Sequence, residues 1–122
     1  MTGTAYPALW DLHYDANDES LHSMAEAYTR IYINTCLSNK VEVLLNIMNK
    51  GKIDGTIYHL NRSCKLMSFL NVETAEIIKG VNGKPYVSFD GDQTDPNVFS
   101  PAQYETRVQA LVEMMEANLA AE

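Results

Sequence analysis

The chain has 122 residues, of which 46% are apolar and 20% are charged, and its formal net charge is −7. This composition is typical of one folded globular domain and excludes a disordered tail. An acidic chain is also a poor candidate for binding nucleic acid or an anionic membrane, because both contacts depend on lysine and arginine; we therefore expect neither partner.

The compartment is indicated by three features of the sequence. No apolar run approaches the roughly 18 residues of a membrane span, and the first seven residues lack the basic and apolar blocks of a secretory signal. The two cysteines, Cys36 and Cys64, are too few for a disulfide framework, which favours a reducing, cytoplasmic location. Residues 30–84 carry a net charge of +4, which makes this region the place to look for an anionic ligand, but on charge alone a mixed solvated surface is the better interpretation.

The first part of the chain is predicted to be helical after an irregular start. Residues 1–20 have no hydrophobic period, whereas residues 21–122 are expected to form the folded α/β domain. Apolar residues first recur at helical spacing at Leu21, Met24, Ala25, Tyr28 and Tyr32. A second helix is predicted to follow Ser38-Asn39 and to close at Gly51.

The middle of the chain has the pattern of a βαβ unit. A strand is predicted over 56–60, a helix over 67–79 that ends at Gly80, and a second strand over 85–89. Strand, helix and strand within about 35 residues indicate parallel strands joined by a right-handed crossover.

The last element is the clearest helix, with Ser100 as its N-cap and Pro101 in its first turn. Its apolar stripe consists of Tyr104, Val108, Leu111, Val112, Met115 and Leu119.

Two parallel strands need cover on both faces and both edges. We therefore expect the chain to be a piece of a larger α/β protein or to act beside a partner.

The candidate site lies beyond the carboxyl ends of the two strands, where ligands of open parallel sheets bind. Two polar loops are predicted there, residues 60–65 and residues 90–96. Cys64 lies just before a helix, between Arg62 and Lys65, and these positive charges favour its thiolate form. Such a thiolate can be a nucleophile, a redox centre or a soft-metal ligand; a half-buried cysteine without chemistry is the alternative.

The remaining cysteine and histidine candidates are weaker. Cys36 has no charged neighbour and is interpreted as a packing residue. One cysteine cannot hold a metal cluster, so a metal at Cys64 needs ligands from sequence outside this chain. His59 lies near the end of the first strand and can orient a ligand, although a satisfied strand-end histidine is the commoner case.

The acidic loop offers a different chemistry. Asp90, Asp92 and Thr94 fit the DxDxT pattern of haloacid-dehalogenase-type phosphatases. Such enzymes also need a later lysine, and none follows this loop. A polar loop with Asp-Pro turn chemistry is the simpler interpretation.

Three strings together resemble the C-terminal region of the 2-hydroxyacyl-CoA dehydratase family: HLNRSCKLMSF (59–69), SFDGDQTDP (88–96) and QYETRVQAL (103–111). The similarity runs from about Leu21 to Leu119 and looks closest to the alpha-type subunit, with the phenyllactyl branch preferred. It implies a flavodoxin-like parallel-sheet fragment, a βαβ unit plus flanking helices, from one subunit of a heterodimer.

The resemblance also implies a cofactor and a reaction. Cys64 is implied to be the last of three cysteine ligands of a 4Fe–4S cluster, with the other two in an N-terminal domain outside this chain. An ATP-dependent activator protein would inject one electron, and a ketyl radical anion of the (R)-2-hydroxyacyl-CoA would expel its hydroxyl group on the way to enoyl-CoA. Arg62, Ser63 and Lys65 are the substrate-proximal candidates, and no catalytic residue is assigned. The chain alone is expected to be inactive; a non-catalytic α/β interaction domain is the alternative.

Overall fold

The computed structural model describes residues 13–15 and 20–121 of the chain. Its contacts form two compact units that meet in sequence at Leu44 and Leu45. Most of the segment 1–20, predicted to be irregular, lies outside the described residues; the described residues 13–15 have no regular secondary structure. No helix in the described ranges is both long enough and apolar enough to cross a membrane.

The first unit contains the predicted helix, which ends earlier than expected. Helix α2 spans Ser20–Thr29, and Tyr32 lies in the 3-10 turn η1, Tyr32–Asn34. The Thr29 hydroxyl donates to the Glu26 carbonyl at 2.7 Å, and the Asn34 amide donates to the Tyr28 carbonyl at 2.9 Å. These side chains take up carbonyl groups that a further helical turn would use, so the helix stops.

Helix α3, Leu37–Gly51, crosses from the first unit into the second. Its first backbone bond runs from the Lys40 N–H to the Cys36 carbonyl at 3.1 Å, so Ser38 and Asn39 lie inside the helix instead of before it. The predicted end at Gly51 is confirmed, but Lys52 is the residue that takes the left-handed conformation, with φ 49°.

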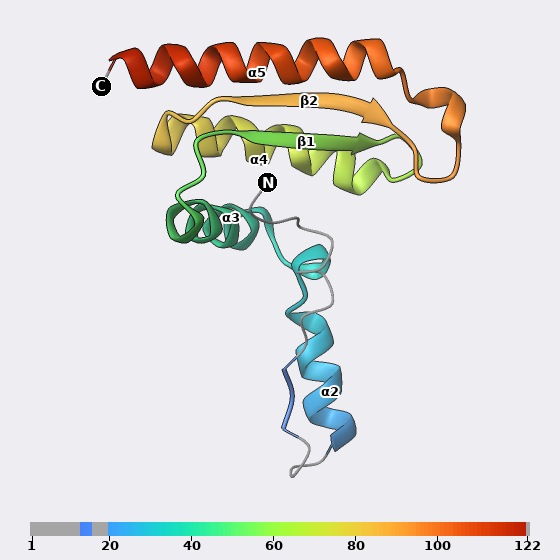
Figure 1. Ribbon diagram of the computed structural model, residues 1–122. Coiled ribbons are helices and arrows are strands. Elements are labelled where there is room, and N and C mark those ends of the chain that lie inside the picture. Colours follow the sequence, from blue (N-terminus) through green and yellow to red (C-terminus); the bar gives the residue numbers. More distant parts are fainter. Residues whose placement is uncertain (1–12, 16–19, 122) are drawn as a thin grey trace. The chain divides into compact units, whose positions relative to one another are not determined.

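The second unit is built on the predicted βαβ unit (Figure 1). Strand β1, Thr56–Asn61, and strand β2, Tyr86–Gly91, are parallel, and the crossover between them is helix α4, Lys65–Asn82. The turn η2, Pro96–Val98, then leads to helix α5, Pro101–Ala121, which starts at the predicted proline. The α/β class and the parallel-sheet fragment are therefore confirmed.

The two long helices use different faces of the strand pair. His59 stacks on Phe89 with ring centroids 5.1 Å apart, and Phe89 meets Tyr104 of α5 edge-on at 5.0 Å. On the other face Tyr86 bonds Glu76 of α4. This alternation is the period of two that a pleated strand imposes. Figure 1 shows α5 running along β2. The buried apolar residues of this unit are Met48, Tyr58, Ala75, Ile78, Val87 and Leu111.

Helix α4 does not end at Gly80 as predicted, but continues to Asn82. Gly83 takes the left-handed conformation, with φ 70°, and its N–H donates to the Lys79 carbonyl at 2.9 Å. A glycine inside a helix costs only about 1 kcal/mol relative to alanine, so Gly80 is tolerated. The end is set by the first residue that adopts the left-handed cap without strain.

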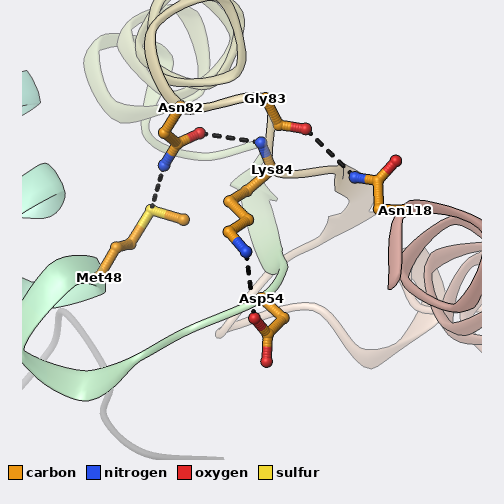
Figure 2. A network of polar contacts seen from close by, with 6 residues as sticks. All are labelled: Met48, Asp54, Asn82, Gly83, Lys84 and Asn118. Atoms are coloured by element: carbon orange, nitrogen blue, oxygen red, sulfur yellow. Dashed lines mark hydrogen bonds and ion pairs between the residues drawn. The ribbon is translucent and has the colours of Figure 1, made fainter. Parts of the chain in front are cut away.

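The turn after α4 is held by polar contacts to both of its sides (Figure 2). The Asn82 side chain accepts from the Lys84 N–H at 3.0 Å, and the Lys84 ammonium lies 3.2 Å from the Asp54 carboxylate just before β1. From α5, the Asn118 amide donates to the Gly83 carbonyl at 3.2 Å. These bonds fix where β2 begins relative to β1 and α5.

Helix α4 also carries an apolar stripe on the side away from its buried residues. Its members are Leu66, Phe69, Ile77 and Val81, with exposed fractions of 57%, 76%, 38% and 65%. A helix that is apolar on two sides is typical of a layer inside a larger structure.

Candidate functional site

The two predicted loops contact one another at the carboxyl edge of the sheet. Strand β1 ends at Asn61 and α4 begins at Lys65, so only residues 62–64 connect them. Strand β2 runs to Gly91, which means that Asp90 is a strand residue and not the loop residue that was expected. The longer strand follows from the register, which pairs Asn61 with Gly91.

Arg62 is joined to the end of β2 by backbone and side chain. Its N–H donates to the Gly91 carbonyl at 3.0 Å, which extends the parallel ladder by one bond. Its guanidinium lies 3.3 Å from the Asp90 carboxylate, and the two side chains are 61% and 51% exposed. An ion pair so exposed contributes about 0.2–1 kcal/mol, but it pairs Arg62 with a carboxylate beside the site.

Ser63 is held by the acidic loop. Its hydroxyl donates to one oxygen of the Asp92 carboxylate, and its N–H donates to the Asn61 side chain at 3.3 Å. The other oxygen of Asp92 accepts from the Thr94 N–H at 2.9 Å and from the Thr94 hydroxyl at 2.7 Å. The bond from Ser63, followed by those from Thr94, holds the pKa of Asp92 well below its usual range.

Cys64 is the N-cap residue of α4, and its backbone is fixed on both sides. Its N–H donates to the Asn61 carbonyl at 3.0 Å, and its carbonyl accepts from the Ser68 N–H at 3.0 Å. The Ser68 hydroxyl donates to the same Asn61 carbonyl at 2.6 Å. The residue is half-buried and its thiol is not in a disulfide. A free thiol on a fixed backbone, next to the exposed Lys65, is suited to bind one metal atom.

Among the described residues, Cys64 is the candidate ligand for a cluster. Within residues 13–15 and 20–121, no group of three or more His, Cys, Asp and Glu side chains is arranged to hold a metal ion. Cys64 fits as a single thiolate donor of the kind that iron–sulfur clusters use. A complete set of cluster ligands would need cysteines from elsewhere, which remains a prediction from the sequence.

Cys36 was predicted to be a packing residue, and this prediction is wrong. The side chain is exposed and lies 3.1 Å from the Ser38 hydroxyl at the start of α3. The bond with Ser38, followed by one with the Asn39 backbone, lowers the pKa of the Cys36 thiol from its ordinary value. Cys36 directly precedes α3, which begins at Leu37, earlier in the chain than expected.

His59 and a shallow pocket complete this edge. The His59 ring is stacked on Phe89, and a Cβ at Gly91 would lie 2.6 Å from its Nε2 atom. The pocket lies between β2 and the first turns of α5, and its lining includes Ser88, Asp90, Gln103 and Arg107. This pocket was not predicted from the sequence. The signal for it in the sequence is Arg107, the one basic residue after position 84.

Comparison with known proteins gives one consistent family. A family model described as 2-hydroxyglutaryl-CoA dehydratase, D-component, matches residues 1–115. The chain is 88% identical over 121 residues to the lactoyl-CoA dehydratase subunit alpha of Anaerotignum propionicum, covering 99% of this chain and 29% of that protein. It is 47% identical over 116 residues to the (R)-2-hydroxyisocaproyl-CoA dehydratase alpha subunit of Clostridioides difficile, covering 95% and 28%.

A third relative bears on the preferred branch. The (R)-phenyllactyl-CoA dehydratase alpha subunit of Clostridium sporogenes is 38% identical over 122 residues, covering all of this chain and 29% of that protein. The preference for the phenyllactyl branch is therefore not supported, because the identity to the lactoyl-CoA enzyme is more than twice as high. The chain spans less than a third of the length of these relatives.

Proposed function

The chain belongs to the 2-hydroxyglutaryl-CoA dehydratase D-component family, and from that premise we propose that it is the C-terminal part of the alpha-type subunit of a 2-hydroxyacyl-CoA dehydratase. The observation that carries the proposal is the fixed Cys64 loop at the carboxyl edge of the parallel strands. That edge is where open α/β sheets bind their ligands.

The proposed reaction of the whole enzyme removes water from an (R)-2-hydroxyacyl-CoA and forms an enoyl-CoA. The C2–OH bond and one C3–H bond break, a carbon–carbon double bond forms, and the hydroxyl group leaves as water, so there is no net oxidation or reduction. The 88% identity to a lactoyl-CoA dehydratase subunit supports a short acyl group of the lactoyl type. A second dehydratase subunit and an ATP-dependent activator protein are the proposed partners.

Cys64 is the residue that would hold the proposed 4Fe–4S cluster, together with cysteines from outside this chain. When bound, such a cluster supplies one-electron chemistry. The chain's own contribution is to hold the ligand in place: Asn61 and Ser68 fix the Cys64 backbone, and Ser63 fixes the peptide before it. Lys65, at the start of α4, would favour the anionic CoA thioester nearby. Arg62 is the weaker candidate, because Asp90 already pairs with it.

The test compares the two cysteines in the full-length subunit, reconstituted anaerobically with iron and sulfide beside its partner subunit. Cys64→Ala is expected to lower the iron and sulfide content and to abolish dehydration of lactoyl-CoA. Cys36→Ala is the matched control and is expected to retain both, because that thiol is exposed in the other compact unit. Unchanged iron, sulfide and activity in Cys64→Ala would refute the proposal.

The two alternative hypotheses are a non-catalytic interaction domain and a phosphatase, and the structure supports them to different degrees. A non-catalytic interaction domain is favoured by the exposed apolar stripe of α4. It predicts a ribosome-binding site and a stop codon upstream of Met1, whereas the dehydratase predicts further coding sequence there with two more cysteines. A phosphatase gains no support, because Asp90 would have to attack phosphate while it is paired with Arg62. That hypothesis predicts magnesium-dependent phosphate release that disappears in Asp90→Asn.

A further inference from the structure

We infer that Asp92 is a positioning residue for Cys64: through Ser63 it fastens the short loop after β1 to the loop after β2, and so holds the thiol where a metal cluster needs it. The inference rests on the proposed function, because it concerns the same cysteine. It also gives a role to the acidic loop, which the sequence predicted only to be a polar turn.

The first step is that the short loop that carries Cys64 is held by its own ends and also from outside. Only residues 62–64 join β1 to α4, and the Cys64 N–H and carbonyl are fixed by Asn61 and Ser68. The side chains of Arg62 and Ser63 are instead held by Asp90 of β2 and by Asp92 of the loop that follows it, 28 and 29 residues later in the chain.

The second step is that Asp92 is arranged in advance to accept from Ser63. One oxygen of its carboxylate is occupied by the N–H and hydroxyl of Thr94, which fixes the side chain in its own turn. The second oxygen accepts from the Ser63 hydroxyl. Ser63 is thus held at its hydroxyl by Asp92 and at its N–H by Asn61. A charged acceptor makes the stronger kind of hydrogen bond.

The third step is a contrast within the same loop. Asp95 makes a similar turn, because its carboxylate accepts from the N–H and the side-chain amide of Asn97 at 3.0 and 2.9 Å. Both aspartates therefore order their own loop, but the bond across to the cysteine loop comes from Asp92. Asp95→Asn is consequently a control for loss of one charge from the loop without loss of that cross-loop bond.

The consequence concerns how firmly iron is retained. Mutation of a residue that orients a metal ligand without contacting the metal typically lowers metal affinity or activity by about 10- to 100-fold. With the Ser63–Asp92 bond cut, Ser63 and Cys64 keep their N–H bonds to Asn61, but the cysteine loop loses its side-chain bond to the loop after β2. We expect the thiol to leave iron more often, and the cluster to be lost faster.

The experiment uses the full-length subunit with its partner subunit, loaded anaerobically, and measures the rate of iron release to a strong iron chelator. Asp92→Asn and Ser63→Ala should each release iron about 10-fold faster than wild type. Ser63→Thr keeps the hydroxyl and should restore the slow rate, and Asp95→Asn should stay within about twofold. The double variant Asp92→Asn/Ser63→Ala should be no faster than either single variant, because both remove one bond.

A second readout does not depend on the cluster. Hydrogen exchange of the Ser63 and Cys64 amides in the metal-free subunit should speed up in Asp92→Asn and not in Asp95→Asn. Unchanged exchange would overturn the fastening itself. Faster exchange with an unchanged rate of iron release would overturn the positioning role. Retention of iron by Cys64→Ala is instead the failure of the proposed function, so the three results are distinguishable.

Discussion

Replacing Gly91 by alanine tests the close approach of β2 to the His59 ring. An added Cβ would lie 2.6 Å from His59 Nε2, whereas ordinary contacts begin at 3.4 Å, so at least about 0.8 Å of movement is needed. The ring cannot yield freely, because it is stacked on Phe89 and the His59 carbonyl accepts from Asn71 of α4 at 3.1 Å. We expect Gly91→Ala to lower the free energy of unfolding by about 1–3 kcal/mol.

The matched control is Gly80→Ala in helix α4. No atom outside the adjoining helix backbone lies within 4 Å of the position of its Cβ, and the residue is inside a helix, so this variant should be more stable by about 0.5–1 kcal/mol. Both variants are measured by urea unfolding at one chain concentration, followed by circular dichroism. A Gly91→Ala variant as stable as wild type would refute the contact with His59, and a destabilised Gly80→Ala would refute the path of α4 through residue 80.

Three further outcomes are expected. The bond from Tyr86 to Glu76 raises the pKa of Tyr86 to about 12. The stabilisation of the fold by this bond is therefore complete below pH 10 and is lost between about pH 10 and 12. Absorbance titration should show a lower Tyr86 midpoint in Glu76→Gln. Alkylation of Cys36 should begin at lower pH than for an ordinary thiol, and Ser38→Ala should shift the profile upward. The exposed apolar stripe of α4 is expected to make the isolated chain self-associate, and Phe69→Glu should reduce this association in sedimentation; an unchanged sedimentation coefficient would argue against α4 as the contact surface.

The strands and their pairing could be predicted because each depends on a short local pattern. Both strands are rich in apolar, β-branched and aromatic residues, and the spacing between them leaves room for one crossover helix. The ends of the helices could not be predicted as well. Gly80 and Gly83 are equally plausible stops in the sequence, and the choice depends on the bonds that Asn82 and Asn118 make around the turn.

In the candidate site, too, the positions of the loops could be predicted from the sequence but the contacts between side chains could not. The topology alone predicts that the loops after β1 and β2 lie at one edge, and Cys64 is found there. The bond between Ser63 and Asp92 joins side chains 29 residues apart, and its existence depends on the rotamers of both. The exposure of Cys36 was missed for a related reason, since it depends on where α3 begins.

The charges at this edge also change the role expected of the basic middle of the chain. Arg62 and Lys65 flank the cysteine, but Asp90 pairs with Arg62 and the carboxylate of Asp92 is bound to Ser63. The two loops also contain Asp95, so they carry three aspartates against the two positive charges of Arg62 and Lys65. An edge without excess positive charge attracts a polyanion such as coenzyme A only weakly. In the proposed function, these loops hold the cysteine in position, and most of the attraction for the coenzyme comes from residues outside them.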